Sequence, residues 1–152
     1  MAGLFVNKTI DINAPVTRVW DVLTKPEYTQ QWIENFGVDG QIDSDWEIGS
    51  EVLWKEKSGK VRVTGNVTAL EPYRRLRFTV HDASEHFDGP QSDNDGITYT
   101  FAEHDGTTLL TVLQGDFGVK PEYRQYYHAT IKVWEIVLPI IKSLAEKEES
   151  SH

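Results

Sequence analysis

The sequence predicts an α+β fold: a curved antiparallel sheet of about six or seven strands around a long C-terminal helix, with two short helices after the first strand. Three patterns predict it. Helical spacing of apolar residues follows a first strand-like segment, between residues 14 and 32. Apolar and polar residues then alternate along most of residues 51–114, as they do in strands. From about Pro121 to Lys147 the spacing is helical again.

The first strand and the two short helices come first along the chain. Leu4–Asn13 alternates and places three apolar side chains on one face, namely Val6, Ile10 and Ile12. Pro15 suits the first turn of a helix, because the N–H that proline lacks would have no partner there. One face of that helix is apolar at the spacing i, i+3, i+4, i+7, with Val16, Val19, Trp20 and Leu23. Pro26 then opens a second helix, in which Tyr28 and Trp32 share a side.

The middle of the chain predicts a series of antiparallel strands. Side chains at every second position share a face: Val52 and Trp54; Val61, Val63, Val67 and Ala69; Leu76, Phe78 and Val80; Ile97, Tyr99 and Phe101. Asp105-Gly106 predicts a tight hairpin turn. The following segment, TTLLTVLQ, is apolar in both phases, so either side of it can face inward. Asp82–Gly96 contains several Asp residues together with Gly, Pro, Ser and Asn, and it predicts a solvated loop.

The C-terminal segment predicts one long amphipathic helix. Its apolar stripe consists of Tyr123, Tyr127, Ile131, Trp134, Leu138, Ile141 and Leu144. The helix predicted from about Pro121 to Lys147 has about seven turns, or roughly 40 Å. Pro139 lies inside it and should kink the helix or remove one hydrogen bond. A stripe of this length has to be covered, and the inner face of a curved sheet is the surface that can cover it.

Composition limits the classes of partner and compartment. The chain has 152 residues, which predicts one domain over residues 1–152. Its formal net charge of −9 argues against nucleic acid or an anionic membrane as the main partner. It contains no cysteine, and it shows neither the pattern of a signal peptide nor an apolar run long enough to cross a membrane. We therefore expect a cytoplasmic protein.

Three segments resemble a known family. INAPVTRVWDVLTKPEYTQQW resembles the N-terminal motif of the Activator of Hsp90 ATPase homologue 1-like family, in the START/Bet v1-like (SRPBCC) superfamily. YTFAEHDGTTLLTVLQGDFG resembles the last hairpin of that family, and VWEIVLPIIKSLAEK its final helix, with Trp134, Leu138 and Ile141 at the family's spacing. The resemblance implies the helix-grip fold, in which the sheet wraps the long helix and leaves a cavity between them. It also implies that the second helix lines the cavity mouth.

The sequence lacks the usual signatures of catalysis and metal binding. It contains no HExxH, GxSxG, GxGxxG or Walker A motif. No two of its five histidines are spaced i, i+4. The acidic segment DSDWE, from Asp43, lacks the Gly and Glu that a calcium loop needs further on, and it predicts a solvated turn. We expect no metal and no cofactor, and we assign no catalytic residue. His128 is either a half-exposed helix histidine or a general base at the cavity edge.

Aromatic side chains are the main candidate site residues, because small-molecule sites are mostly apolar with a few polar groups. The side chains expected to line the cavity are Trp32, Phe36, Trp54, Phe78, Tyr99, Phe101, Tyr127, Ile131, Trp134 and Leu138. The hydroxyls of Tyr99 and Tyr127 and the tryptophan N–H groups would orient a ligand. The alternative is that these rings simply fill the core.

These observations favour a non-enzymatic protein that binds a hydrophobic or aromatic small molecule between the sheet and the long helix. One alternative is a cyclase- or dehydratase-like enzyme acting on an aromatic or polyketide-like substrate, since the superfamily that the chain resembles includes such enzymes. A further alternative is an Hsp90 co-chaperone-like stress protein, as the name of the family suggests. A homodimer is compatible with the exposed sheet edges, but no sequence feature specifies one.

Overall fold

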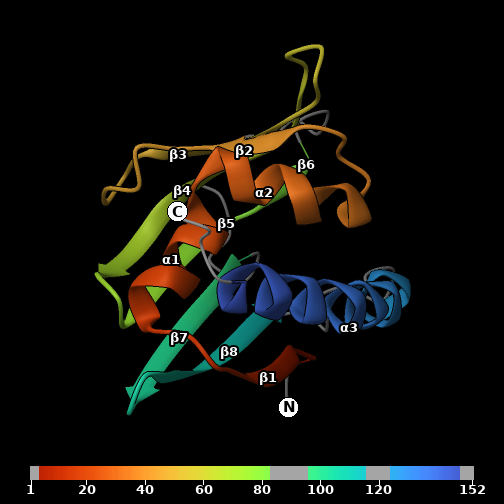
Figure 1. Ribbon diagram of the computed structural model, residues 1–152. Helices are drawn as coiled ribbons and strands as arrows, with labels where there is room; N and C mark the ends of the chain where they lie inside the picture. Colours follow the sequence, from red (N-terminus) through yellow and green to blue (C-terminus); the bar gives the residue numbers. More distant parts are fainter. Residues whose placement is uncertain (1–3, 83–95, 116–123, 148–152) are drawn as a thin grey trace.

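The structure is a computed structural model that describes residues 4–82, 96–115 and 124–147. Its elements follow one another along the chain (Figure 1) as β1 (Val6–Ile12), α1 (Val16–Thr24), α2 (Pro26–Trp32), η1 (Ile33–Phe36), β2 (Gln41–Asp43), β3 (Glu51–Lys55), β4 (Val61–Glu71), β5 (Arg75–Thr79), β6 (His81–Asp82), β7 (Gly96–His104), β8 (Thr107–Gly115) and α3 (Arg124–Glu146). The predicted order of elements is confirmed, and a short 3₁₀ helix, η1, is added. Most of the predicted loop Asp82–Gly96, and Tyr123, lie outside the described residues.

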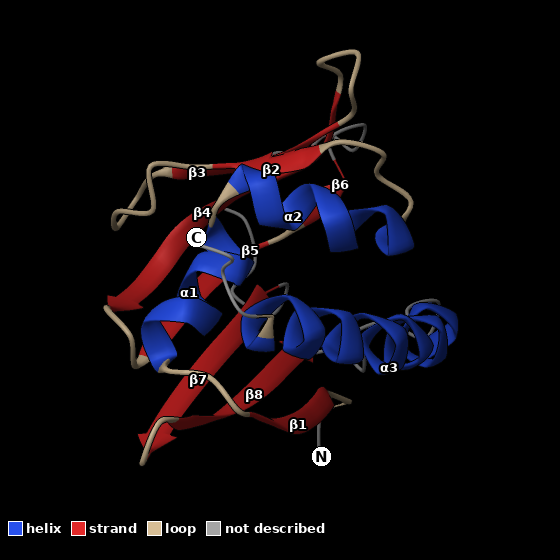
Figure 2. Cartoon of the chain, viewed as in Figure 1, coloured by secondary structure: helices blue, strands red, loops and turns tan. Residues whose placement is uncertain are grey.

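The described strands form one antiparallel sheet. Its order is β1-β8-β7-β5-β4-β3-β2, and β6 pairs with β4. The sheet curls around α3, and α1 and α2 lie on its open side (Figures 1 and 2). This is the predicted helix-grip arrangement of a curved sheet, a long C-terminal helix and short helices after the first strand.

The structure decides which side of β8 faces inward. Leu110 and Val112 are fully buried, whereas Leu109 and Leu113 are exposed on the outer face. The register explains the choice, because β7 sets Phe101 opposite Leu110 and Tyr99 opposite Val112. Cross-strand partners share a face, so the inward rings of β7 determine the inward residues of β8.

The long helix α3 has 23 residues, which is about 35 Å. Its buried side chains are Trp134, Val137, Leu138, Ile141 and Ala145. Pro139 lies within the helix on an exposed position, where it removes one backbone N–H without disturbing the buried face. In the part of the chain that the structure describes, no helix is both long enough and apolar enough to cross a membrane.

The strand β4 changes partners along its length. Its first half pairs with β3 and β6, and its second half pairs with β5. Gly65 lies at the change, where β4 and β5 approach so closely that an added Cβ would come within 1.7 Å of the Thr79 carbonyl oxygen. The strand can therefore curl at this point only because residue 65 has no side chain.

Arg18 ties the two short helices to the end of α3. Its guanidinium donates to the carbonyl oxygens of Ala145 at 3.2 Å and Lys147 at 3.1 Å, which belong to the last turn of α3 and its end. It also donates to the Tyr28 hydroxyl at 3.1 Å and lies over the Tyr28 ring. A cation at this end stabilises the helix, because the last carbonyls of a helix have no partner within it.

Replacing Arg18 with alanine should lower the free energy of unfolding by about 2 kcal/mol, since it removes several charge-assisted hydrogen bonds. Arg18→Lys should recover less than half of that loss, because an ammonium cannot reproduce the planar fork of a guanidinium. Urea denaturation of the three proteins measures both values. Equal stability of the lysine and arginine forms would show that the charge alone matters.

The edge of the sheet at β1 is joined to α3 by side chains. Lys142 Nζ donates to the Asp11 carbonyl oxygen at 2.7 Å, and the backbone N–H of Asn13 donates to Glu146 Oε2 at 2.7 Å. Lys8 and Glu135 form an ion pair at 3.0 Å. Backbone groups at an edge are normally available to another strand, and α3 already occupies two of them.

Glu146 makes the stability of this edge depend on pH. The hydrogen bond from Lys142, followed by that from the Asn13 N–H, lowers the pKa of the Glu146 carboxyl below its ordinary value of 4.5. Folding therefore favours the ionised carboxylate. Its contribution to the free energy of unfolding is fully present above the unfolded pKa and is lost as the pH falls through the lower folded pKa. The destabilisation caused by Glu146→Gln should accordingly be largest near pH 7 and should shrink toward pH 3.

Chemical denaturation at several pH values measures this difference. In a Lys142→Gln background the Glu146→Gln effect should be smaller at pH 7, because Lys142 supplies the largest contribution. A Glu146→Gln effect that stays constant down to pH 3 would contradict the assignment.

Candidate functional site

The predicted lining residues come together on the inner side of the sheet and the facing helices. Seven of them are buried, namely Trp32, Trp54, Phe78, Tyr99, Phe101, Trp134 and Leu138. Phe36, Tyr127 and Ile131 are partly buried and pack against the same core. We call the set formed by Trp32, Phe36, Trp54, Phe78, Tyr99, Phe101 and Trp134 the aromatic wall. These rings come from α2, η1, β3, β5, β7 and α3.

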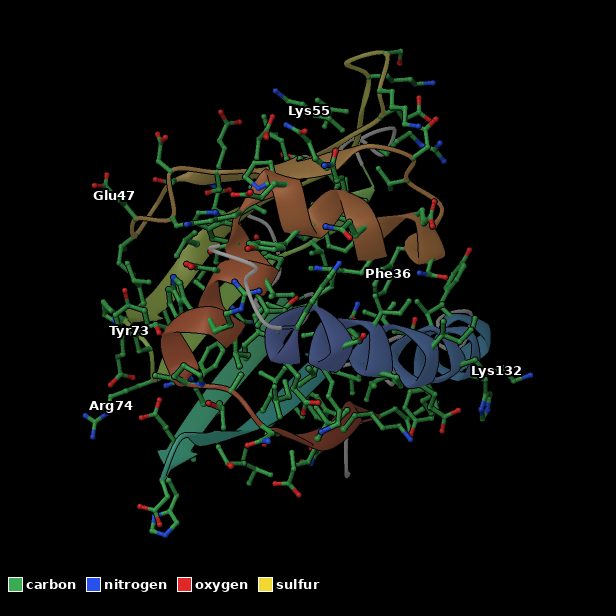
Figure 3. The ribbon with its side chains drawn as sticks, viewed as in Figure 1. Phe36, Glu47, Lys55, Tyr73, Arg74 and Lys132 are labelled. Carbon is green, nitrogen blue, oxygen red and sulfur yellow. The ribbon has the colours of Figure 1, made fainter. Side chains whose placement is uncertain are left out.

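Phe36 contacts rings of the aromatic wall that come from α2, from α3 and from the sheet. Its ring centroid is 5.1 Å from that of Trp134, 5.4 Å from that of Trp54 and 6.2 Å from that of Trp32. These rings meet edge to face, which aromatic quadrupoles favour. Phe36 belongs to η1 and faces α3 (Figure 3), and it is partly exposed, whereas the other rings of the wall are buried. It therefore marks the side from which the buried rings are nearest to solvent.

Tyr99 is the corresponding centre on the sheet. Its ring centroid lies 5.9 Å from that of Phe78, 6.5 Å from that of Phe101 and 6.2 Å from that of Trp134. Tyr99 is 1% exposed. The contact between Tyr99 and Trp134 joins the sheet half of the aromatic wall to the helical half, so the wall is one continuous set of rings.

Some tryptophan N–H groups serve the scaffold instead of a ligand. The Trp32 Nε1–H donates to the Val22 carbonyl oxygen at 2.9 Å, which ties α2 to α1. The Trp134 Nε1–H donates to Gln114 Oε1 at 2.8 Å, which ties α3 to β8. The expectation that tryptophan N–H groups in general face a ligand is therefore wrong for these two residues.

Two polar groups of the aromatic wall are buried without a hydrogen-bond partner among the described residues. They are the Trp54 indole N–H and the Tyr99 hydroxyl. Leaving such a group unsatisfied costs about 1–3 kcal/mol, and most buried polar groups in native proteins avoid it. Burial raises the pKa of the Tyr99 hydroxyl, which therefore stays protonated and able to donate at neutral pH.

His128 and His81 stand apart from the aromatic wall. His128 is exposed on α3, with its ring 5.3 Å from that of Tyr127. His81 is buried, but β6 pairs it with Thr64, whereas Trp54 pairs with Val63. Neighbouring residues of a strand point to opposite faces, so His81 and Trp54 lie on different sides of the sheet. Across residues 4–82, 96–115 and 124–147, no group of three His, Asp or Glu side chains is placed to hold a metal ion.

Trp46 is partly buried and packs against the core, although its place in an acidic segment predicted a solvated turn. The predicted solvated turn from Asp43 does expose Asp45 and Glu47, but Trp46 turns inward against Phe78, with ring centroids 5.7 Å apart. Its Nε1–H donates to the Thr24 carbonyl oxygen at 3.1 Å, and its φ is 54°, in the left-handed region. The signal was the tryptophan itself, an unusual residue for a short acidic turn.

A separate surface pocket of about 450 Å³ lies beyond the aromatic wall. Its lining residues are Gln30, Gln31, Glu34, Asp39, Gly40, Gln41, Lys55, Glu56, Lys57 and Gly59. None of these belongs to the predicted lining set. Two of its charged residues form ion pairs with neighbours, Lys55 with Asp43 at 3.2 Å and Glu56 with Arg62 at 2.8 Å. The polar lining differs from the mostly apolar lining of small-molecule sites.

Comparison with solved structures supports the fold. A protein from Mesorhizobium loti, MLL2253, superposes with a TM-score of 0.70 at 20% identity, over 94% of this chain and 98% of that one. The Aha1 dimer from Colwellia psychrerythraea gives 0.68 at 15% identity, over 96% and 97%. DynU16, from the dynemicin biosynthetic locus, gives 0.71 at 20% identity, over 96% of this chain but 48% of that one.

Comparison at the level of sequence families identifies the relatives. No curated protein matches the chain. The family described as Activator of Hsp90 ATPase homolog 1-like protein matches residues 13–146, which run from the end of β1 to the end of α3. The match includes every element that carries the aromatic wall, and the solved neighbours share the helix-grip, Bet v1-like fold. The chain therefore belongs to the Activator of Hsp90 ATPase homolog 1-like family.

Proposed function

We propose that the protein binds a hydrophobic or aromatic small molecule between the sheet and α3, against the aromatic wall. The observation that carries the proposal is the pair of buried donors, Trp54 N–H and Tyr99 O–H, that have no partner among the described residues. A bound molecule with an acceptor atom would satisfy a donor for which the described residues supply no partner. Burial of its rings against the wall would supply most of the affinity.

Comparison of the buried donors within the aromatic wall supports a ligand-binding site over a core that only packs. Trp32 and Trp134 are as deeply buried as Tyr99, and both N–H groups reach an acceptor in the chain. A core that only packs would be expected to treat Trp54 and Tyr99 in the same way, since an open buried donor is costly. The exceptions are thus confined to two positions on the sheet side.

A binding role without catalysis is favoured by the residues of the wall. Its seven side chains, together with Tyr127, Ile131 and Leu138, include no carboxylate, imidazole or amine. Burial raises the pKa of the Tyr99 hydroxyl, so it cannot serve as a base near neutral pH. General-base chemistry on an enclosed substrate would need a group that this set does not contain.

The second candidate is a cyclase-like enzyme, and the Tyr99 hydroxyl is the observation that favours it. A buried, neutral hydroxyl can donate to a substrate carbonyl oxygen as negative charge develops there. The origin of DynU16 in a biosynthetic locus fits such a role. Mass spectrometry of a bound compound after prolonged incubation would distinguish the candidates, because a binder returns the compound unchanged.

Intrinsic tryptophan fluorescence against a panel of apolar and aromatic compounds tests binding itself. A saturable change is expected, and Phe36→Ala should weaken it about tenfold, because a ring that contacts three tryptophans of the wall is lost. Phe5→Ala is the matched control, since Phe5 is 41% exposed and lies outside the wall. Equal weakening by both changes, or no saturable response, would count against the proposal.

A further inference from the structure

We propose that the site recognises uncharged aromatic molecules through their hydrogen-bond acceptors, with the Tyr99 hydroxyl and the Trp54 N–H as the two donors that set this specificity. The inference rests on the proposed function and goes further, because it states the chemical class of the ligand. It excludes compounds whose polar atoms only donate, and it excludes ions of either sign.

The chemistry of the two donors gives the direction of the hydrogen bonds. An indole N–H can only donate. A phenol can donate or accept, but its proton requires an acceptor whenever water is excluded, and burial keeps that proton on the Tyr99 oxygen. A ligand that offers acceptors satisfies both groups, whereas a ligand that offers only N–H donors leaves the indole unpaired.

The placement of the donors within the aromatic wall favours a ligand with an aromatic body. Trp54 contacts Phe36, and Tyr99 contacts Trp134, while Phe36 and Trp134 contact each other. The rings that carry the two donors are therefore joined through Phe36 and Trp134 in one set of ring contacts. An aromatic ligand can bury its rings among these side chains and offer an acceptor to a donor of the same set.

The absence of charge from the lining set determines the charge of the ligand. None of the ten predicted lining residues carries a cation that would pair with an anionic group, or a carboxylate that would pair with a cation. Moving an unpaired ion into such surroundings is far more costly than moving a neutral acceptor that receives a hydrogen bond. Neutral ring nitrogens and carbonyl oxygens are acceptors of the right kind.

Three bicyclic probes of nearly equal size separate the effect of a hydrogen-bond acceptor on the ligand from the effects of a donor and of apolar contact. Naphthalene has no polar atom, quinoline has an acceptor nitrogen, and indole has a donor N–H. NMR titration of the full chain at pH 8, where quinoline is uncharged, gives a dissociation constant for each probe. The proteins compared are the wild type, Tyr99→Phe, Trp54→Phe and the double variant.

The ratio of the naphthalene dissociation constant to the quinoline dissociation constant measures how strongly the site prefers a ligand with an acceptor. Any change in the volume of the site affects both probes alike and cancels in the ratio. The double variant should lower this ratio about tenfold relative to the wild type, the effect of one lost hydrogen bond. The corresponding ratio for naphthalene and indole should change less than twofold.

Any other outcome contradicts this inference, the proposed function or both. If both probes bind and the quinoline ratio is the same in the wild type and the double variant, the donors do not select the ligand and this inference fails, although the proposed function stands. If the double variant weakens indole instead of quinoline, the direction of the hydrogen bonds is reversed and the inference also fails. If no probe binds the wild type, the proposed function fails together with it.

Discussion

Replacing Gly65 with alanine is expected to lower the free energy of unfolding by about 3 kcal/mol or more. The new Cβ would come within 1.7 Å of the Thr79 carbonyl oxygen and 2.5 Å of its carbon, so backbone atoms have to move apart. This is where β4 leaves β3 and β6 and joins β5, and where the sheet curls toward α3. Urea denaturation followed by circular dichroism measures the change.

Gly59→Ala is the control for this substitution. Gly59 has a φ of +94° but no atom within 4 Å of an added Cβ, so its variant carries backbone strain without a collision. A loss of about 1 kcal/mol is expected there. If Gly65→Ala were no more destabilising than Gly59→Ala, the close approach of β4 and β5 would not constrain the residue.

Replacing Trp134 with alanine is expected to cost about 4 kcal/mol. Trp134 is fully buried and contacts the rings of Trp32, Phe36 and Tyr99. The change removes these contacts and leaves a large hole at the point where the sheet and helical halves of the aromatic wall meet. It also removes the donor that holds Gln114.

Ile136→Ala provides the matched control on the same helix. Ile136 is 54% exposed, so its truncation should change the free energy of unfolding by less than about 0.5 kcal/mol. Thermal and chemical denaturation of both variants compare the two faces of α3. Similar losses at residues 134 and 136 would mean that the buried face is not the one that packs against the wall.

The features that sequence predicts well in this protein are those set by local patterns. The helical spacing around Trp134, Leu138 and Ile141 identifies the buried face of α3, because 3.6 residues per turn fixes which side chains share a side. The pair Asp105-Gly106 predicts its turn for a similar reason, and both residues do have positive φ, 52° and 80°. The inward positions of Phe78, Tyr99 and Phe101 follow from strict alternation.

The features that sequence does not predict depend on partners far along the chain. The sequence TTLLTVLQ does not indicate which of its two sides faces inward, and the register with β7 determines that side. The indole of Trp32 finds an acceptor in α1 and that of Trp134 finds one in β8, whereas that of Trp54 finds none among the described residues. All three residues are tryptophans, so the residue type does not show which partner the indole N–H has. Only the folded structure distinguishes an indole that donates within the chain from one that could donate to a ligand.

The attachment of β1 to both β8 and α3 has a consequence for the order of folding. Val6 pairs with Gln114, and Lys8 meets Glu135, so the first strand finds its partners only after nearly the whole chain is available. During synthesis β1 must wait until the last hairpin and then the final helix have left the ribosome. Contacts so distant in sequence favour slow and cooperative folding. The closing step of folding is thus expected to unite the two ends of the chain.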